Sequence, residues 1–90
     1  MSELLMTKRE KLLNRIRNNP KAVRFEDACK MAQSLGFIYE GGSGSHRVFK
    51  RKGEPLQLNF QNRNGYIPPY QARQLLAIIE KYADGDEIPD

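Results

Sequence analysis

The residues of this 90-residue chain that are suited to chemistry lie together in the segment 41–52. Glycine and serine occupy positions 41–45, and their small side chains let a backbone approach a ligand closely. His46, the only histidine, follows, and an imidazole with an ordinary pKa of about 6.5 exchanges protons near neutral pH. Four of the next six residues are basic, and lysine and arginine bind phosphate. The segment therefore predicts chemistry on a nucleic acid backbone.

The charge of the chain also favours an anionic partner. The net charge is +4, from 15 basic and 11 acidic residues. Four of the acids lie in the tail 84–90, so the rest of the chain carries 15 bases against 7 acids, an excess of eight. Such an excess is typical of nucleic-acid-binding domains, with a basic domain that is merely soluble as an equal alternative.

Length and composition predict one small cytoplasmic domain. Ninety residues fit a single domain, and the sequence contains neither an apolar run of about 18 residues nor a signal-peptide pattern. Cys29 is the only cysteine and cannot form an internal disulfide, which fits a reducing cytoplasm. One histidine and one cysteine are too few for a zinc cluster, so we expect no metal, no cofactor and no membrane partner.

Two helices are predicted before the segment 41–52. The first covers about 7–18, because Thr7 and Glu10 have the spacing of a capping box. Its many basic side chains indicate a solvated face, with RNA contact as the alternative. The second begins at Phe25 and ends at the left-handed cap Gly36. Cys29 falls within its apolar stripe, which indicates an inert core residue.

A third helix is predicted to begin at Pro68-Pro69, since proline is tolerated in a first turn, and to end at Asp84-Gly85. Its predicted apolar face consists of Tyr70, Leu75, Ile78, Ile79 and Tyr82. Gln71 and Arg73, near its start, are further candidates for RNA contact.

Three short strands are predicted between the second and third helices, over 37–40, 46–51 and 56–61. Residues 41–45 are predicted to form a loop, and residues 52–55 a hairpin turn. An antiparallel meander of this kind buries one face under helices and leaves the other to solvent. The expected fold class is therefore α+β, with a three-stranded antiparallel sheet packed on helices.

The alternation of residues assigns the two faces of the predicted sheet. Phe49 is the best core candidate on the second strand, which places Arg47 and Arg51 on its side with their charged heads in water. The opposite orientation, which buries Val48, is the alternative. In the favoured orientation one open polar face contains His46, Lys50, Gln57, Asn59 and Gln61.

Over about residues 8–83 the sequence resembles the HicA family, the RNA-cleaving toxins of toxin–antitoxin systems. The resemblance rests on short motifs that recur in order and at matching spacing around one histidine. These motifs are Asn19-Pro20-Lys21, Val23-Arg24-Phe25-Glu26-Asp27, Leu35-Gly36-Phe37, Gly44-Ser45-His46 with Val48-Phe49, Leu58-Asn59 with Gln61, Pro69-Tyr70-Gln71 and Arg73-Gln74-Leu75-Leu76.

The resemblance implies a fold, an activity and a partner. It implies a fold like the double-stranded RNA-binding domain, an α-β-β-β-α core over about 19–83, within a single domain 1–90 that adds the helix 7–18 and the acidic tail. It also implies an mRNA interferase, a metal-independent endoribonuclease, that is blocked by a HicB-like antitoxin. His46 is the implied catalytic residue, with Gly44 and Ser45 as its loop. Many members carry a second histidine where this chain has Arg47.

RNA supplies its own nucleophile, the 2′-hydroxyl group, so His46 would act as general base or general acid. The predicted RNA-binding residues are Gly44, Ser45, Arg47, Lys50, Arg51 and Lys52, and backbone N–H groups of 42–45 could cradle a phosphate. A solvated hairpin is the alternative for 50–52. For the whole chain, the alternatives are a non-catalytic RNA-binding module and a protein that binds only an antitoxin.

Overall fold

The structure, a computed structural model, describes residues 6–82 of the chain. Six elements follow one another: α1 (Lys8–Asn18), α2 (Phe25–Ser34), β1 (Ile38–Ser43), β2 (His46–Lys50), β3 (Leu58–Gln61) and α3 (Pro69–Tyr82). This order confirms the α+β class. The predicted tail 84–90 and the predicted end of the last helix lie outside the described residues.

Local signals set the helix ends where they were expected. The Thr7 hydroxyl accepts a hydrogen bond from the backbone N–H of Glu10 at 3.1 Å. The Glu10 carboxylate accepts one from the backbone N–H of Thr7 at 2.9 Å, which completes the capping box of α1. After α2, Gly36 adopts a φ of 87°, the left-handed conformation that ends many helices. α3 begins at Pro69, where a missing N–H leaves no helical hydrogen bond unmade.

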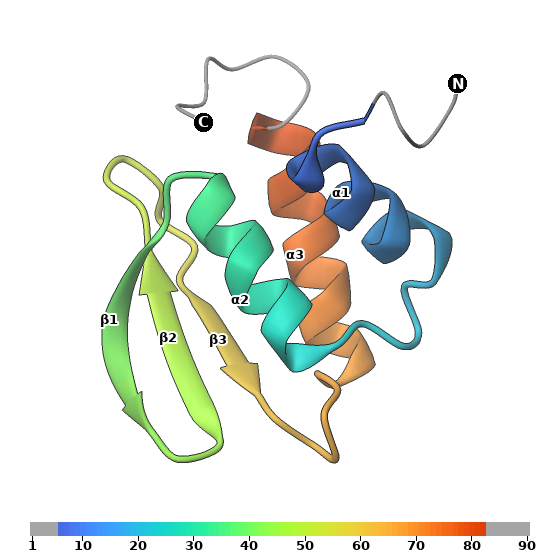
Figure 1. Ribbon diagram of the computed structural model, residues 1–90. Coiled ribbons are helices and arrows are strands. Elements are labelled where there is room, and N and C mark those ends of the chain that lie inside the picture. Colours follow the sequence, from blue (N-terminus) through green and yellow to red (C-terminus); the bar gives the residue numbers. More distant parts are fainter. Residues whose placement is uncertain (1–5, 83–90) are drawn as a thin grey trace.

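The three strands form one antiparallel sheet in the order β1-β2-β3, as Figure 1 shows. β2 is the central strand, and its register fixes the neighbours of each side chain. His46 lies opposite Ser43 on β1 and Gln61 on β3, whereas Phe49 lies opposite Tyr39 and Leu58. Because side chains alternate along a strand, His46 and Phe49 point to opposite faces of the sheet.

All three helices lie on one side of the sheet (Figure 1). α2 and α3 contact the sheet, and α1 packs against α2. The core forms between them, where Phe49, Leu58 and Phe60 of the sheet are no more than 1% exposed. The other face of the sheet carries the exposed side chains of His46, Lys50 and Asn59. The predicted assignment of the two faces is therefore confirmed.

Three predictions about the elements need correction. β1 extends to Ser43 rather than ending at residue 40, and β3 starts at Leu58, two residues later than expected. Tyr70, predicted on the apolar face of α3, is 51% exposed, and its place in the buried set is taken by Gln71 and Ala72. Within residues 6–82, no helix is long and apolar enough to cross a membrane.

Candidate functional site

His46 begins β2, and its side chain is exposed on the face of the sheet away from the helices. The hydroxyl oxygen of Ser45 lies 3.3 Å from His46 Nδ1, at hydrogen-bonding distance. This contact engages one ring nitrogen and restricts the orientation of the imidazole. Within residues 6–82 the other ring nitrogen, Nε2, forms no hydrogen bond, so it is accessible from the open face.

The turn that precedes His46 is tighter than the sequence predicted. The predicted loop over 41–45 is wrong, because β1 continues through Ser43 and only Gly44 and Ser45 form the turn. Gly44 has a φ of 38°, and a positive φ at the first position of a two-residue hairpin turn favours glycine. The backbone N–H of Asn62 donates to the Ser45 carbonyl at 2.7 Å. The turn is therefore held on both sides rather than forming a wide phosphate cradle.

Gly42 brings the backbone of β1 very close to that of His46. A Cβ atom added at Gly42 would lie 2.2 Å from the His46 carbonyl oxygen and 3.1 Å from the Arg47 Cα atom. The φ of Gly42 is 149°, which also disfavours a side chain. The register shift between Tyr39 and Gly41 lies just before this approach. Gly42 therefore marks close packing of two strands rather than a loop.

Most of the predicted polar residues lie on the same open face of the sheet as His46. Lys50 lies on the same face of β2, and Asn59 and Gln61 lie on the same face of β3. Gln61, directly opposite His46, accepts a hydrogen bond from Arg63 Nε at 3.1 Å. Arg63 was not predicted as a site residue, because its position depends on the loop that follows β3. It adds a cationic group beside Gln61, in the loop just after β3.

Arg47 and Arg51 point to the helix side, as the alternation predicted. The expectation that both charged heads lie in water is wrong for Arg51, whose Nη1 atom is buried. The Arg47 guanidinium lies 5.0 Å from the centre of the Phe25 ring, and its Nη1 atom lies 3.6 Å from the Glu26 carboxylate. The Arg51 guanidinium lies 3.6 Å from the centre of the Tyr82 ring. Of the basic residues predicted to bind RNA, only Lys50 therefore shares the face of His46, and Lys52 lies exposed in the turn after β2.

Cys29 is an unsuitable nucleophile in this structure. Its side chain is buried in α2, and burial raises the pKa of its thiol. A hydrogen bond from Arg47 at 3.9 Å acts in the opposite direction but is the smaller effect. The thiol is therefore protonated near neutral pH, as expected of an inert core residue.

Gln71 and Glu54 are buried polar groups that hold the sheet rather than a ligand. Gln71, predicted as an RNA contact, is 4% exposed, and its Oε1 atom accepts a hydrogen bond from the backbone N–H of Gln61 at 2.8 Å. The Glu54 carboxylate accepts hydrogen bonds from Lys81 Nζ at 2.6 Å, from the Tyr82 hydroxyl and from the backbone N–H of Leu56 at 2.8 Å. These bonds, that of Lys81 first, lower the pKa of Glu54 to about 2.

Neither a cluster of metal-binding side chains nor a similar known protein identifies the site further. Among residues 6–82, no three His, Cys, Asp or Glu side chains gather in a way that would hold a metal ion. None of the protein-family models, curated proteins or solved structures compared with the chain matches it. The proposals below therefore rest on the residues and their geometry.

Proposed function

We propose that the chain is a HicA-type toxin, a metal-independent endoribonuclease that cleaves mRNA in the cytoplasm and is held inactive by a HicB-like antitoxin. The observation that carries the proposal is the position of His46. Its imidazole is exposed on the open face of the sheet and is oriented by Ser45 at 3.3 Å. The order α2-β1-β2-β3-α3 supports the fold like the double-stranded RNA-binding domain that the resemblance implies, with α1 as an N-terminal addition.

The reaction uses the 2′-hydroxyl of RNA as nucleophile. His46 takes the proton of this hydroxyl, the 2′-oxygen forms a bond to phosphorus, and the bond from phosphorus to the 5′-oxygen breaks. The 5′-oxygen leaves with a proton from water, and the other product ends in a 2′,3′-cyclic phosphate. A positioned general base contributes about 10²–10⁴-fold to such a rate. No step needs a metal ion.

Cations on the open face stabilise the charge that develops on the phosphate. Arg63 is hydrogen-bonded to Gln61, which lies opposite His46, and Lys50 lies further along the same face of β2. Fixed cationic groups of this kind act by electrostatic preorganisation. Gly44 and Ser45 form the turn that contacts the RNA. Arg47, Arg51 and Lys52 add positive charge to the hairpin.

The same exposed face is the surface that a HicB-like antitoxin would cover. A partner that buries His46 and neutralises Lys50 and Arg63 would stop both catalysis and RNA binding. Carboxylate groups on the partner suit this role, because they pair with lysine and arginine as phosphate does.

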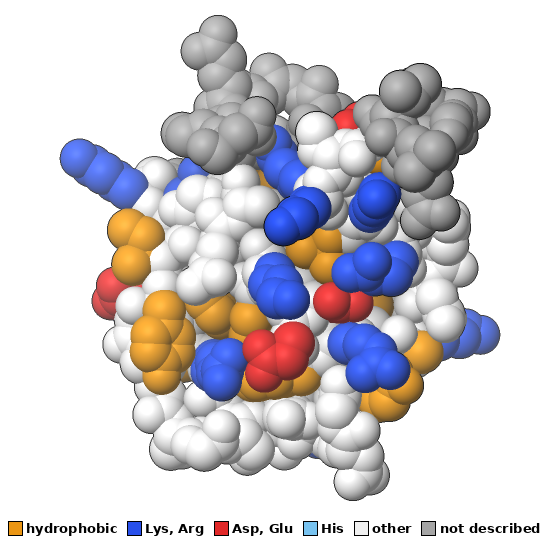
Figure 2. Space-filling view, viewed as in Figure 1, with side chains coloured by type: hydrophobic (Ala, Val, Ile, Leu, Met, Phe, Trp, Pro, Cys, Tyr) orange, Lys and Arg blue, Asp and Glu red, His pale blue; other side chains and the backbone are white. Residues whose placement is uncertain are grey.

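The proposal is tested by inducing the chain in growing cells. The wild type should arrest growth, His46→Ala should not, and co-expression of an antitoxin that binds the open face should restore growth. A second candidate, a non-catalytic RNA-binding module, is favoured by the basic side chains that gather over α1 and α2 (Figure 2). Equal arrest by wild type and His46→Ala at equal expression would support that candidate against the enzyme.

A further inference from the structure

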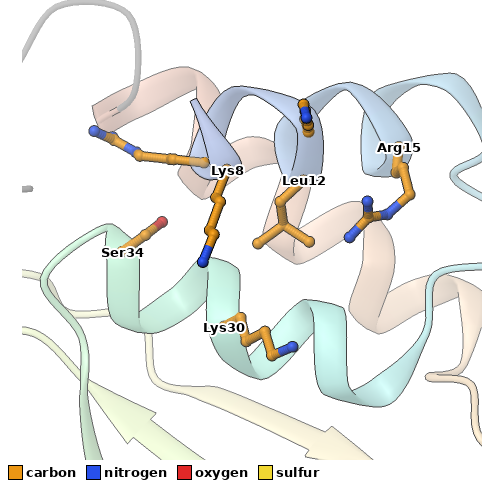
Figure 3. A pocket seen from close by; sticks show the side chains of 7 residues that line it. Lys8, Leu12, Arg15, Lys30 and Ser34 are labelled. Atoms are coloured by element: carbon orange, nitrogen blue, oxygen red, sulfur yellow. The ribbon is translucent and has the colours of Figure 1, made fainter. Parts of the chain in front are cut away.

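A basic groove runs between α1 and α2, on the side of α2 that faces α1 rather than the sheet. It has a volume of about 370 Å³ and is lined by residues of both helices: Lys8, Arg9, Lys11, Leu12 and Arg15 of α1, and Lys30 and Ser34 of α2. Figure 3 shows the side chains of Lys8, Leu12 and Arg15 directed toward α2. Five of the seven lining residues are cationic, so the groove concentrates positive charge.

The positive charge of the groove is poorly neutralised. Lys8, Lys11 and Lys30 form no ion pair within the described part of the chain. Arg15 is paired with Asp27, whose carboxylate lies 3.4 Å from Arg15 Nη2. Like charges held near one another repel, and an anion in the groove would relieve that repulsion.

The folding of α1 does not account for this cluster. Lys8 and Lys11 lie at the N-terminal end of α1, where the helix macrodipole disfavours positive charge. A helix built only for stability would carry acidic residues there, yet Glu10 is the only acid of the first turn and already serves the capping box. Residues that oppose local stability in this way are expected at functional sites.

The chemistry of the groove suits phosphates better than a protein partner. Its one large apolar residue, Leu12, is 7% exposed and already packs in the core, so no apolar anchor is offered to a docking protein. Lysine ammonium groups on flexible stems bind phosphates as point charges without fixed geometry. Their distribution over two helices fits an anion with several charges along its length, which is the character of a nucleic acid backbone.

We propose that the α1–α2 groove binds the phosphodiester backbone of RNA, as a second site separate from His46. The choice of RNA as the polyanion rests on the proposed function. His46 lies on the open face of the sheet, and α2 contacts the sheet on its other face, so the groove cannot take part in the chemical step. The groove binds a part of the RNA that is remote from the cleaved bond. It therefore raises the affinity only for those RNA molecules that are long enough to reach both sites.

The test uses the full chain with His46→Ala, so that the RNA stays intact, and a fluorescently labelled single-stranded RNA. Lys11→Gln/Lys30→Gln removes one lysine from each wall of the groove. Lys21→Gln/Arg24→Gln removes two exposed cations that line no part of it. The groove variant should bind about tenfold more weakly, and the slope of log K against log salt should fall by about 1.4, since each phosphate contact on a single strand contributes about 0.7. The control should change affinity less than about twofold.

Equal losses in the groove variant and the control would overturn the proposal, as would tighter binding of a polyglutamate peptide than of RNA, which would indicate an acidic protein partner. Circular dichroism of both variants excludes unfolding as the cause of a loss. In the chain with His46 intact, the groove variant should cleave a short oligonucleotide with unchanged kcat, and a loss of kcat would contradict the separation of the sites. If RNA binding depended on the groove but the wild type cleaved no RNA, the ribonuclease proposal would be wrong and the proposal of an RNA-binding groove would stand.

Discussion

Gly42 is the residue on which the backbone position of His46 most directly depends. Strands β1 and β2 approach so closely there that a Cβ atom added at Gly42 would lie 2.2 Å from the His46 carbonyl oxygen. Backbone atoms cannot move aside as the end of a flexible side chain can, so any substitution shifts the start of β2. Gly42 therefore acts as a positioning residue for the imidazole.

We expect Gly42→Ala to lower the free energy of unfolding by about 1–3 kcal/mol through backbone strain and to reduce RNA cleavage further by moving His46. Gly41→Ala is the matched control, because Gly41 also has a positive φ, 127°, but has nothing within 4 Å of the added Cβ. Chemical denaturation and cleavage rates measured on both variants check this. If the two variants lost stability and activity equally, the close approach at Gly42 would have no role of its own.

Among the secondary-structure elements, the loop between β2 and β3 is hydrogen-bonded to the C-terminal end of α3. Glu54 lies in this loop, and its partners Lys81 and Tyr82 form the last turn of the helix. Arg51 covers the ring of Tyr82 from the same loop. The end of β2 remote from His46 is thereby fixed to the helical layer.

The lowered pKa of Glu54 predicts how the stability of the fold depends on pH. Its pKa is about 2 in the folded chain, against an ordinary value of 4.5, so the folded state favours the carboxylate. Its contribution is complete above about pH 4.5 and is lost as the pH falls from there toward about 2. We expect Glu54→Gln to melt below the wild type at pH 7, with the difference shrinking across that window. Glu80→Gln, an exposed position on α3, should show no such convergence, and a constant difference for Glu54→Gln would contradict this role of the carboxylate.

The elements that could be predicted are those set by neighbouring residues. The capping box of Thr7 and Glu10 and the alternation that separates His46 from Phe49 both depend on short spacings, and both are confirmed. The predicted loop over 41–45 is wrong for a physical reason: glycine often marks a loop, whereas Gly42 permits two strands to approach closely.

Long-range partners could not be predicted in the same way. The bond from Gln61 to Gln71 joins β3 to α3, and the bonds of Glu54 cross 27 and 28 positions in the chain. Nothing in the local pattern distinguishes such buried polar residues from exposed ones. Arg63 was missed for a related reason, since only the register of β3 shows that its partner Gln61 lies opposite His46.

For the whole molecule, the arrangement separates two charged surfaces. The open face of the sheet carries His46 with Lys50 and Arg63, and the far side of the helical layer carries the α1–α2 groove. The first is proposed for the chemical step and the second for affinity. Such a division predicts that substitutions on one surface change kcat and substitutions on the other change binding.

The central claim, that His46 makes this chain a ribonuclease, is tested most directly by incubating the purified chain with labelled RNA in excess chelator. The wild type should cleave the RNA and leave 2′,3′-cyclic phosphate ends. His46→Ala, shown by its melting curve to be folded, should be slower by about 10²–10⁴-fold, the usual contribution of a general acid or base. Undiminished cleavage by His46→Ala, or no cleavage by the wild type, would contradict the account.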